Sequence, residues 1–190
     1  MDNFSAAYGS LIGVEGTYSN HPDDRGGETY KGISRVYEPS WYGWNIIDDQ
    51  RDVPGFPENL SHTMGLEYAV REFYRATYWD YFSCASLPYE VAYELFEISV
   101  NMGKRVATEF LQRALNAFNK KGTLWKDIAI DGVFGPKTLE ATKDMCNARD
   151  CTGTDALAKA LNCQQGERYI TLSLGREQNE SFTWGWFSRV

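Results

Sequence analysis

Two carboxylates and a threonine hydroxyl lie close together near the start of the chain, at Glu15, Asp24 and Thr29. Asp24 follows Glu15 by nine residues, and Thr29 follows Asp24 by five. A pair of carboxyl groups can hydrolyse a glycosidic bond, because one protonates the leaving oxygen while the other activates water or attacks the sugar. A nearby threonine hydroxyl could position the attacking water. Carboxylate pairs also bind metal ions, so the residue types alone leave both chemistries open.

The segment 15–33 that carries these residues is predicted to be an active-site loop. It contains four glycines and a proline, and three further carboxylates follow Glu15 within it. Long connections without regular structure are usually functional or disordered, and the strong patterning on both sides argues against disorder. Gly26, Gly27 and Gly32 would allow positive φ angles or the close approach of a substrate.

A helix predicted over residues 4–15 would hold Glu15 in place. At about 100° per residue, Glu15 lies roughly 20° from Phe4 around the helix axis, on the apolar face. Burial and the negative end of the helix dipole would both raise the pKa of Glu15, and a carboxyl that stays protonated near neutral pH suits general acid catalysis. The alternative is a solvated glutamate at a fraying helix end. The apolar positions of this helix are Phe4, Tyr8, Leu11 and Ile12.

The rest of the chain is predicted to be mainly helical. The spacing of apolar residues and the signals for helix ends predict five further helices. Residues 36–60 show no clear period and are expected to be irregular. The aromatic segment 184–189 is expected to pack back onto the helical body. The predicted helices lie at 61–82, 88–102, 104–119, 136–148 and 154–174.

Charge and composition exclude several classes of partner. The chain has 190 residues and a formal net charge of −7 at pH 7. Residues 1–86 carry 13 acidic and 6 basic side chains, whereas residues 87–190 carry 13 of each. An acidic chain without a stripe of Lys and Arg is a poor binder of nucleic acid. Its apolar runs are too short for stable membrane insertion, and its N-terminus lacks the features of a signal peptide, so synthesis in the cytoplasm is expected.

No cofactor and no metal are expected. The cysteines form no C-x-x-C pair, the two histidines lie far from them in sequence, and the acidic loop does not have the spacing of an EF-hand. In an oxidising compartment Cys146 could pair with Cys151, or either of them with Cys163. Reduced, buried thiols are the preferred interpretation. The cysteines are Cys84, Cys146, Cys151 and Cys163.

The sequence from Glu15 to Ile33 resembles the EGGYxNxPxDxGGxTxxGI signature of the glycoside hydrolase 108 family. Members of that family are lysozyme-like N-acetylmuramidases, found in phage endolysins and in bacterial proteins linked to secretion. Other segments are similar to the family's YxxxYW and FDxAVNxG motifs, and to LQxAL, DGxxGPxTL and GWxxR of its peptidoglycan-binding region. These segments lie at 74–79, 96–103, 111–115, 131–139 and 185–189.

The resemblance implies that Glu15 is the catalytic acid. Asp24 and Thr29 are assigned by similarity to phage-type lysozymes, in which Glu, Asp and Thr occur in this order with the same Glu–Asp spacing and the Thr one residue further on. Tyr18 and Asn101 are predicted to contact the substrate, and the alternative for Asn101 is a helix cap.

The chain departs from the family pattern at three positions. Thr17 replaces a glycine, so the geometry of the loop is expected to differ there. His21 replaces a common Asp and is interpreted as a hydrogen-bonding residue of the loop and not as a catalytic base. Glu97 stands where Asp is usual.

The function expected from the resemblance is peptidoglycan degradation by an endolysin-type muramidase, acting on glycan strands and leading to cytolysis. The enzyme would act on periplasmic or cell-wall peptidoglycan after release, as a monomer. A lysozyme-like α+β catalytic region at 1–86 would share one core with a peptidoglycan-binding region at 87–190. The alternatives are a lytic transglycosylase, which needs the acid but no activated water, and a non-catalytic protein that binds the wall or assists secretion.

Overall fold

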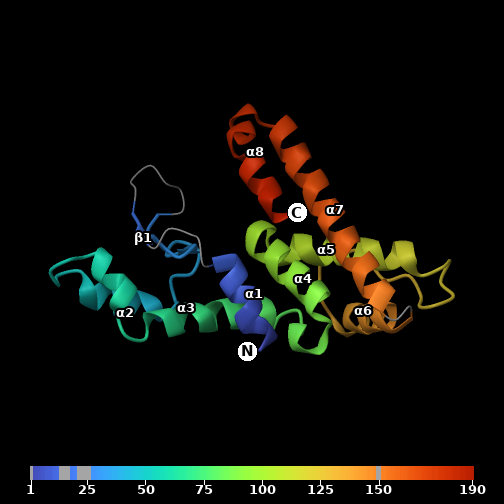
Figure 1. The fold of residues 1–190 in the computed structure, drawn as a ribbon, viewed down its shortest axis with the longest axis horizontal. Helices are drawn as coiled ribbons and strands as arrows, with labels where there is room; N and C mark the ends of the chain where they lie inside the picture. The colour runs from blue at the N-terminus through green and yellow to red at the C-terminus, as the bar shows by residue number, and fades with distance from the viewer. Residues whose placement is uncertain (1, 13–17, 21–26, 149–150) are drawn as a thin grey trace. The chain divides into compact units, whose positions relative to one another are not determined.

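The computed structural model describes residues 2–12, 18–20, 27–148 and 151–190. The chain divides into two compact units, Met1–Thr77 and Tyr78–Val190. Helices make up most of the described residues in both units, and the described strands form one small sheet in the first unit (Figure 1). The predicted mainly α fold is therefore confirmed.

Helix α1, Asn3–Ile12, opens the first unit, and Phe4, Tyr8 and Leu11 of its predicted apolar face are buried. The backbone N–H of Ser5 donates to the Asp2 carboxylate at 2.8 Å, so Asp2 caps the N-terminus. Phe4 and Tyr8 are buried, and the guanidinium of Arg71 lies over the Tyr8 ring, 4.9 Å from its centroid. This burial fixes the orientation of the helix that precedes residue 15.

Helix α2, Gly43–Gln50, lies in a stretch that the sequence predicts to be irregular. Trp44 and Ile47, one turn apart, are fully buried and anchor the helix. A 3-10 helix, η1 at Glu58–His62, follows it. The prediction of an irregular segment at 36–60 is therefore wrong for these residues. A helix of two turns with two buried side chains is too short to show a period in the sequence.

Helix α3, Leu66–Tyr74, continues into a π-helix, η2 at Arg75–Trp79. It begins later than predicted, because Gly65 takes a left-handed conformation, φ 82°, and separates it from η1. Leu66, Val70 and Tyr74 are buried along one face.

Three two-residue strands form an antiparallel sheet in the order β1-β2-β3. The strands are β1 at Tyr18–Ser19, β2 at Thr29–Tyr30 and β3 at Ile33–Ser34. Tyr30 and Ile33 are buried, and the Tyr30 ring stacks on Trp41 with the centroids 6.5 Å apart. The described part of the predicted active-site loop is thus a small sheet that packs on an aromatic base.

Five helices make up most of the second unit (Figure 1). Helix α4 packs against α5 and α7, and α6 packs against α7. The fully buried side chains of these helices include Leu95, Phe96, Leu111, Leu115, Leu157 and Leu161. Gly103, with φ 88°, ends α4 and begins α5, as its position in the sequence predicts. The helices are α4 at Tyr89–Met102, α5 at Lys104–Phe118, α6 at Pro136–Ala148, α7 at Cys151–Leu174 and α8 at Glu180–Trp186.

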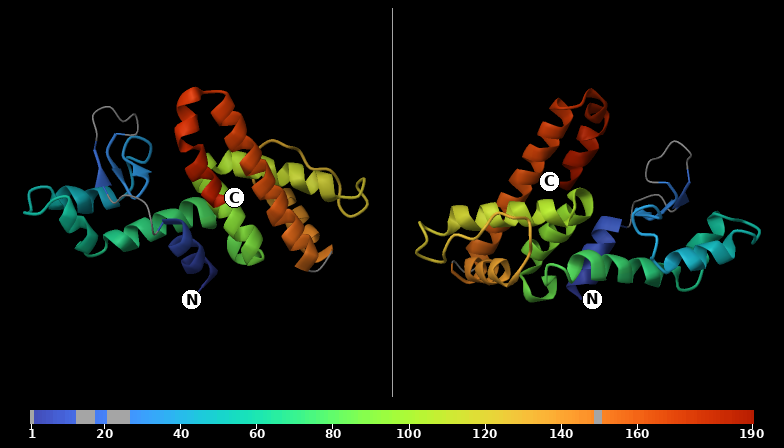
Figure 2. Two further views of the ribbon diagram at one scale, coloured as in Figure 1. Left: turned by 45° about the horizontal axis from the view of Figure 1, so that its top comes forward. Right: turned by 180° about the vertical axis from the view of Figure 1, so that it is seen from behind.

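The C-terminal segment folds back along α7, and Figure 2 shows α8 beside that helix from two further sides. The Trp186 ring stacks on Tyr169 with the centroids 5.4 Å apart. Gly166 lies within α7, and a Cβ at this position would make an ordinary van der Waals contact with the Phe187 ring, 3.5 Å away. Trp184, in contrast, is 91% exposed.

The thiols of Cys84, Cys146 and Cys163 are unpaired. Cys84 and Cys146 are buried as predicted, but Cys163 is exposed, because it lies on the outer face of α7. The described helices include none that combines the length and the apolar character needed to cross a bilayer.

Candidate active site

The predicted site residues divide into two groups. Glu15 and Asp24 lie outside the described residues, together with Thr17 and His21 of the same loop. Thr29 and the two predicted substrate contacts, Tyr18 and Asn101, are described, so the surroundings of the site are built from the residues on either side of the acids.

Thr29 lies at the centre of the small sheet. It pairs with Ser19 on one side and with Ser34 on the other. Residues paired across a sheet project from the same face, so these three hydroxyl side chains form a row. The opposite face carries Tyr30 and packs on Trp41. The hydroxyl row therefore lies on the face away from the aromatic base, where it can reach water or sugar hydroxyls.

The turn between β2 and β3 fixes the position of this row. Lys31 and Gly32 have φ angles of 44° and 78°, as a two-residue hairpin turn of type I′ requires. The Tyr74 hydroxyl donates to the Lys31 carbonyl at 2.7 Å, and the Lys31 ammonium contacts Glu67 at 2.6 Å. A Cβ at Gly32 would come within 2.9 Å of the Tyr74 hydroxyl oxygen, so glycine is needed both for its φ and for the close approach.

A network of two carboxylates and two arginines joins the sheet to α2. Glu28 accepts hydrogen bonds from Tyr18 Oη at 2.9 Å, from Arg35 Nη1 at 2.8 Å and from Arg51 Nη2 at 2.5 Å. Asp48 accepts from Arg35 Nη1 and from Arg51 Nε, both at 2.8 Å, and also from Arg35 Nη2. Each arginine thus bridges the two carboxylates and ties β1 and β2 to the helix.

The network keeps both of its carboxylates ionised. Burial alone would raise the pKa of Glu28, but hydrogen bonds from Arg35, Arg51 and Tyr18 outweigh it and hold the pKa below its ordinary value. Hydrogen bonds from Arg35 are the main reason that the pKa of Asp48 lies well below its ordinary value. Neither group can hold a proton near neutral pH, so neither can serve as a general acid.

This network was missed by the sequence analysis, which noted Glu28 only as one more acid in the loop. The available signal was the spacing of Asp48 and Arg51, three residues apart and paired on one helix. It went unnoticed because the segment was expected to be irregular. Arg35 had no sequence signal, since its two partners lie on different elements.

Tyr18 uses its hydroxyl inside this network, and its ring meets Phe56 edge to face with the centroids 5.1 Å apart. Asn101, in the second unit, donates to the Glu97 carbonyl at 2.9 Å and to the Glu97 carboxylate at 2.6 Å. Glu97 is 1% exposed and also accepts from Gln165. Substrate contact by Tyr18 and by Asn101 stays a prediction.

No group of three His, Cys, Asp or Glu side chains among the described residues could hold a metal ion. The residues that are described in the first unit offer hydroxyls, aromatic rings and fixed charges. This set suits the binding of a polar polymer such as a sugar chain.

Comparison with known proteins gives the family. Residues 8–103, just over half of the chain, match the family Glycosyl hydrolase 108. The chain belongs to glycosyl hydrolase family 108. Residues 106–190 of this family 108 hydrolase match a second family, described as a predicted peptidoglycan domain. Together the two matches make it a peptidoglycan-degrading glycoside hydrolase, and the predicted resemblance is confirmed.

A solved structure supports the same assignment. The hydrolase is similar to SagA of Brucella abortus, with a TM-score of 0.58 and 25% sequence identity over 98% of this chain and 88% of that one. No curated protein matches the chain.

The family matches meet between residues 103 and 106, whereas the compact units meet at Thr77 and Tyr78. The predicted boundary at 86 and 87 lies between these two divisions. The glycosyl hydrolase match extends through α4. Helix α4 therefore belongs to the hydrolase family by sequence but lies in the second compact unit. The sharing of one core by the two regions stays a prediction.

Proposed function

We propose that this hydrolase is an N-acetylmuramidase that cleaves the β-1,4 bond between N-acetylmuramic acid and N-acetylglucosamine. The observation that carries the proposal is the family match over residues 8–103, which includes the whole Glu15–Thr29 segment. The adjoining peptidoglycan domain supports the same polymer as substrate. After synthesis in the cytoplasm and release, the enzyme would act on cell-wall peptidoglycan as an endolysin does, as a monomer.

The general acid in this proposal is Glu15. Of the loop carboxylates, Glu28 is described, and its arginine partners keep it ionised. Helix α1, which precedes Glu15, buries Phe4, Tyr8 and Leu11 on one face. A carboxyl group that continues this face would be partly desolvated, and its pKa would rise toward the range that a general acid needs.

Asp24 and Thr29 handle the water in this proposal. Thr29 is held rigidly, because its strand pairs on both sides and the turn that follows is pinned by Tyr74. A hydroxyl on a fixed strand can orient a water for attack, whereas a mobile one cannot. Asp24 precedes Glu28, which the arginine network holds in place, by four residues. In this proposal Asp24 accepts the proton of that water or attacks the sugar itself.

The decisive experiment is digestion of purified peptidoglycan by Glu15→Gln, with mass spectrometry of the released fragments. Loss of a general acid lowers the rate by about 10²- to 10⁴-fold. Glu58→Gln, an exposed glutamate of η1 in the same unit, serves as the matched control and should digest at the parent rate. Undiminished release by Glu15→Gln would contradict the assignment.

The same digests separate the alternatives. Fragments with a reducing N-acetylmuramic acid end support hydrolysis, whereas 1,6-anhydro ends would identify a lytic transglycosylase. Thr29→Val, which removes the hydroxyl but keeps the shape, should slow hydrolysis more than Thr29→Ser. Binding to the wall without any fragment release by the parent would identify a non-catalytic wall-binding protein.

A further inference from the structure

The long connection between α5 and α6, residues 119–135, is held in a fixed shape by side chains of α5. Asn116 makes two hydrogen bonds to it, donating to the Ile128 carbonyl at 2.8 Å and accepting from the Ile128 N–H at 2.9 Å. The buried Trp125 indole donates to the Leu115 carbonyl at 3.2 Å. The connection is therefore a built surface of the second unit and not a free loop.

Three consecutive residues at the start of this connection are left-handed. The φ angles are 53° at Lys120, 60° at Lys121 and 72° at Gly122. One left-handed residue commonly ends a helix, and glycine or asparagine is favoured there because a Cβ is strained. Two lysines in succession are not explained by helix termination alone. Strained backbone of this kind collects at functional positions, which directs attention to the two side chains.

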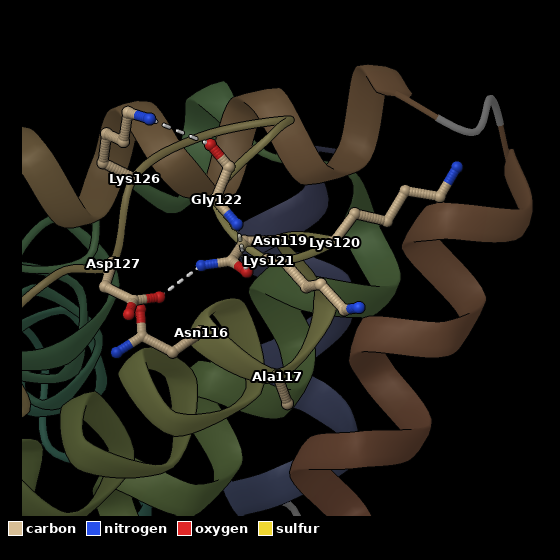
Figure 3. A pocket seen from close by; sticks show the side chains of 8 residues that line it. All are labelled: Asn116, Ala117, Asn119, Lys120, Lys121, Gly122, Lys126 and Asp127. Carbon is tan, nitrogen blue, oxygen red and sulfur yellow. Dashed lines mark hydrogen bonds between the residues drawn. The ribbon is translucent and has the colours of Figure 1, made fainter.

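A hollow of about 880 Å³ opens beside these lysines. Figure 3 shows Lys126 on one side of it, and Lys120 and Lys121 on the other. The Lys126 ammonium donates to the Gly122 carbonyl at 3.3 Å. The one carboxylate in the lining, Asp127, is hydrogen-bonded to Asn119. The three lysine side chains point in different directions from the hollow, so together they can meet separate carboxylates of an extended anionic polymer.

Two further hollows continue along the same connection. The next, of about 360 Å³, shares Lys126 with the first, and the third, of about 380 Å³, shares Lys137 with the second. Exposed apolar side chains, Ile130 and Val133, lie on the same stretch, and Val133 lines the third hollow. Lys137, Glu140 and Asp144 also line the second hollow, and only the third is mainly apolar. A row of hollows along one connection suits an extended polymer better than a small molecule.

We propose that residues 119–138 form the surface through which the second unit binds peptidoglycan, with Lys120, Lys121 and Lys126 holding carboxylates of the peptide stems. The inference rests on the proposed function. A chain with a net charge of −7 is repelled by an anionic wall, so it needs a local cationic contact to stay on its substrate. The lysine hollow supplies this contact, and the mainly apolar third hollow takes alkyl side chains of the stems.

The test is co-sedimentation of the full chain, carrying Glu15→Gln to prevent digestion, with purified peptidoglycan stripped of attached polymers. Lys120→Gln/Lys121→Gln should bind roughly 3- to 10-fold more weakly at low salt, as expected for the loss of two exposed ion pairs, and the difference should shrink at high salt. Lys143→Gln/Lys159→Gln makes the same charge change at exposed lysines outside the three hollows and should bind like the parent.

Two further measurements identify which anion of the wall is bound and test whether the weaker binding comes from unfolding of the variant. Peptidoglycan freed of its peptide stems should bind the parent and the Lys120/Lys121 variant equally. The proposal would be overturned if the variant still bound more weakly than the parent to stem-free glycan. It would also be overturned if the two differed only on walls that keep their phosphate polymers. Lys120→Asn/Lys121→Asn suits the left-handed backbone, so it should unfold no earlier than the parent and still bind weakly.

Equal binding by both double glutamine variants would also overturn the inference while leaving the proposed function intact. The proposed function fails by a different result, the absence of fragment release by the parent enzyme. The two outcomes are therefore read from separate measurements.

Discussion

The first unit holds a pair of ionised carboxylates, whereas the second holds a partly buried carboxyl group, Glu94, whose pKa is shifted in the opposite direction. Glu28 and Asp48 in the first unit share two arginines, and the pKa of each is lowered. Glu94, beside Glu97 in the second unit, has a pKa raised to about 7. The first pair is charged at neutral pH, whereas Glu94 titrates near neutrality.

The difference comes from the partners of each pair. Desolvation is the main cause of the raised pKa of Glu94, the charge of Glu97 adds to it, and the hydrogen bond from Asn162 at 3.0 Å only partly opposes it. The other oxygen of Glu94, Oε2, is buried without a hydrogen-bond partner among the described residues. Glu28 is also desolvated, but two cations reverse the effect. Burial therefore does not decide the charge of a carboxylate; the type of its partner does.

The largest expected effect comes from breaking the arginine pair. Arg51→Met keeps the length of the side chain but removes its hydrogen bonds to Glu28, Asp48 and Tyr18. Because the network is partly exposed, we expect a loss of about 2 kcal/mol in the free energy of unfolding, measured by urea denaturation at pH 7. Arg113→Met, at an exposed position of α5, should change it by less than about 0.5 kcal/mol.

The pH dependence sharpens this test. The folded-state pKa values of Glu28 and Asp48 are lowered, so their contribution to stability is present above the ordinary carboxylate pKa and is lost as the pH falls. The stability difference between Arg51→Met and the parent should therefore shrink on acidification below about pH 4. A difference that is constant with pH would show that the arginine acts only through packing.

Glu94→Gln should have a smaller effect of the opposite sign. The folded-state pKa of Glu94 is raised above its ordinary 4.5, so its contribution is most favourable below that value and is lost as the pH rises through about 7. The variant should be more stable than the parent by on the order of 1 kcal/mol at pH 8 and unchanged at pH 4, allowing for partial exposure. Thermal unfolding at the two pH values measures it, and a pH-independent effect would contradict the raised pKa.

The smallest effect is expected from Tyr18→Phe, which tests whether Tyr18 acts through the network or on the substrate. Its hydroxyl is bonded to Glu28, so its removal should lower the stability by about 0.5–1 kcal/mol. The KM for peptidoglycan fragments should stay within about twofold of the parent value if the ring makes the substrate contact. A large rise in KM with unchanged stability would assign the hydroxyl to the substrate instead.

Much of the helical fold could be predicted from the sequence because its signals are local. Pro88 and Gly103 mark the ends of α4, and Pro136 marks the start of α6. The apolar spacing of α5 predicted a helix that matches within a residue at each end. Helix α2 was missed, because two buried side chains in eight residues give no period. The sheet was missed because its three strands have only two residues each, so they show no alternation.

The sequence by itself determined the order Glu15, Asp24 and Thr29, the glycine at the turn after Thr29, and the family, because each of these depends on residue type and spacing along the chain. Only the tertiary structure decided which carboxylates are charged. Arg35, which follows β3, bonds to Glu28 before β2 and to Asp48 in α2. The lysine hollow forms where the connection after α5 is hydrogen-bonded to that helix. Electrostatic partners and surfaces arise from residues distant in sequence, so their effect on pKa and on binding cannot be read from the order of the residues.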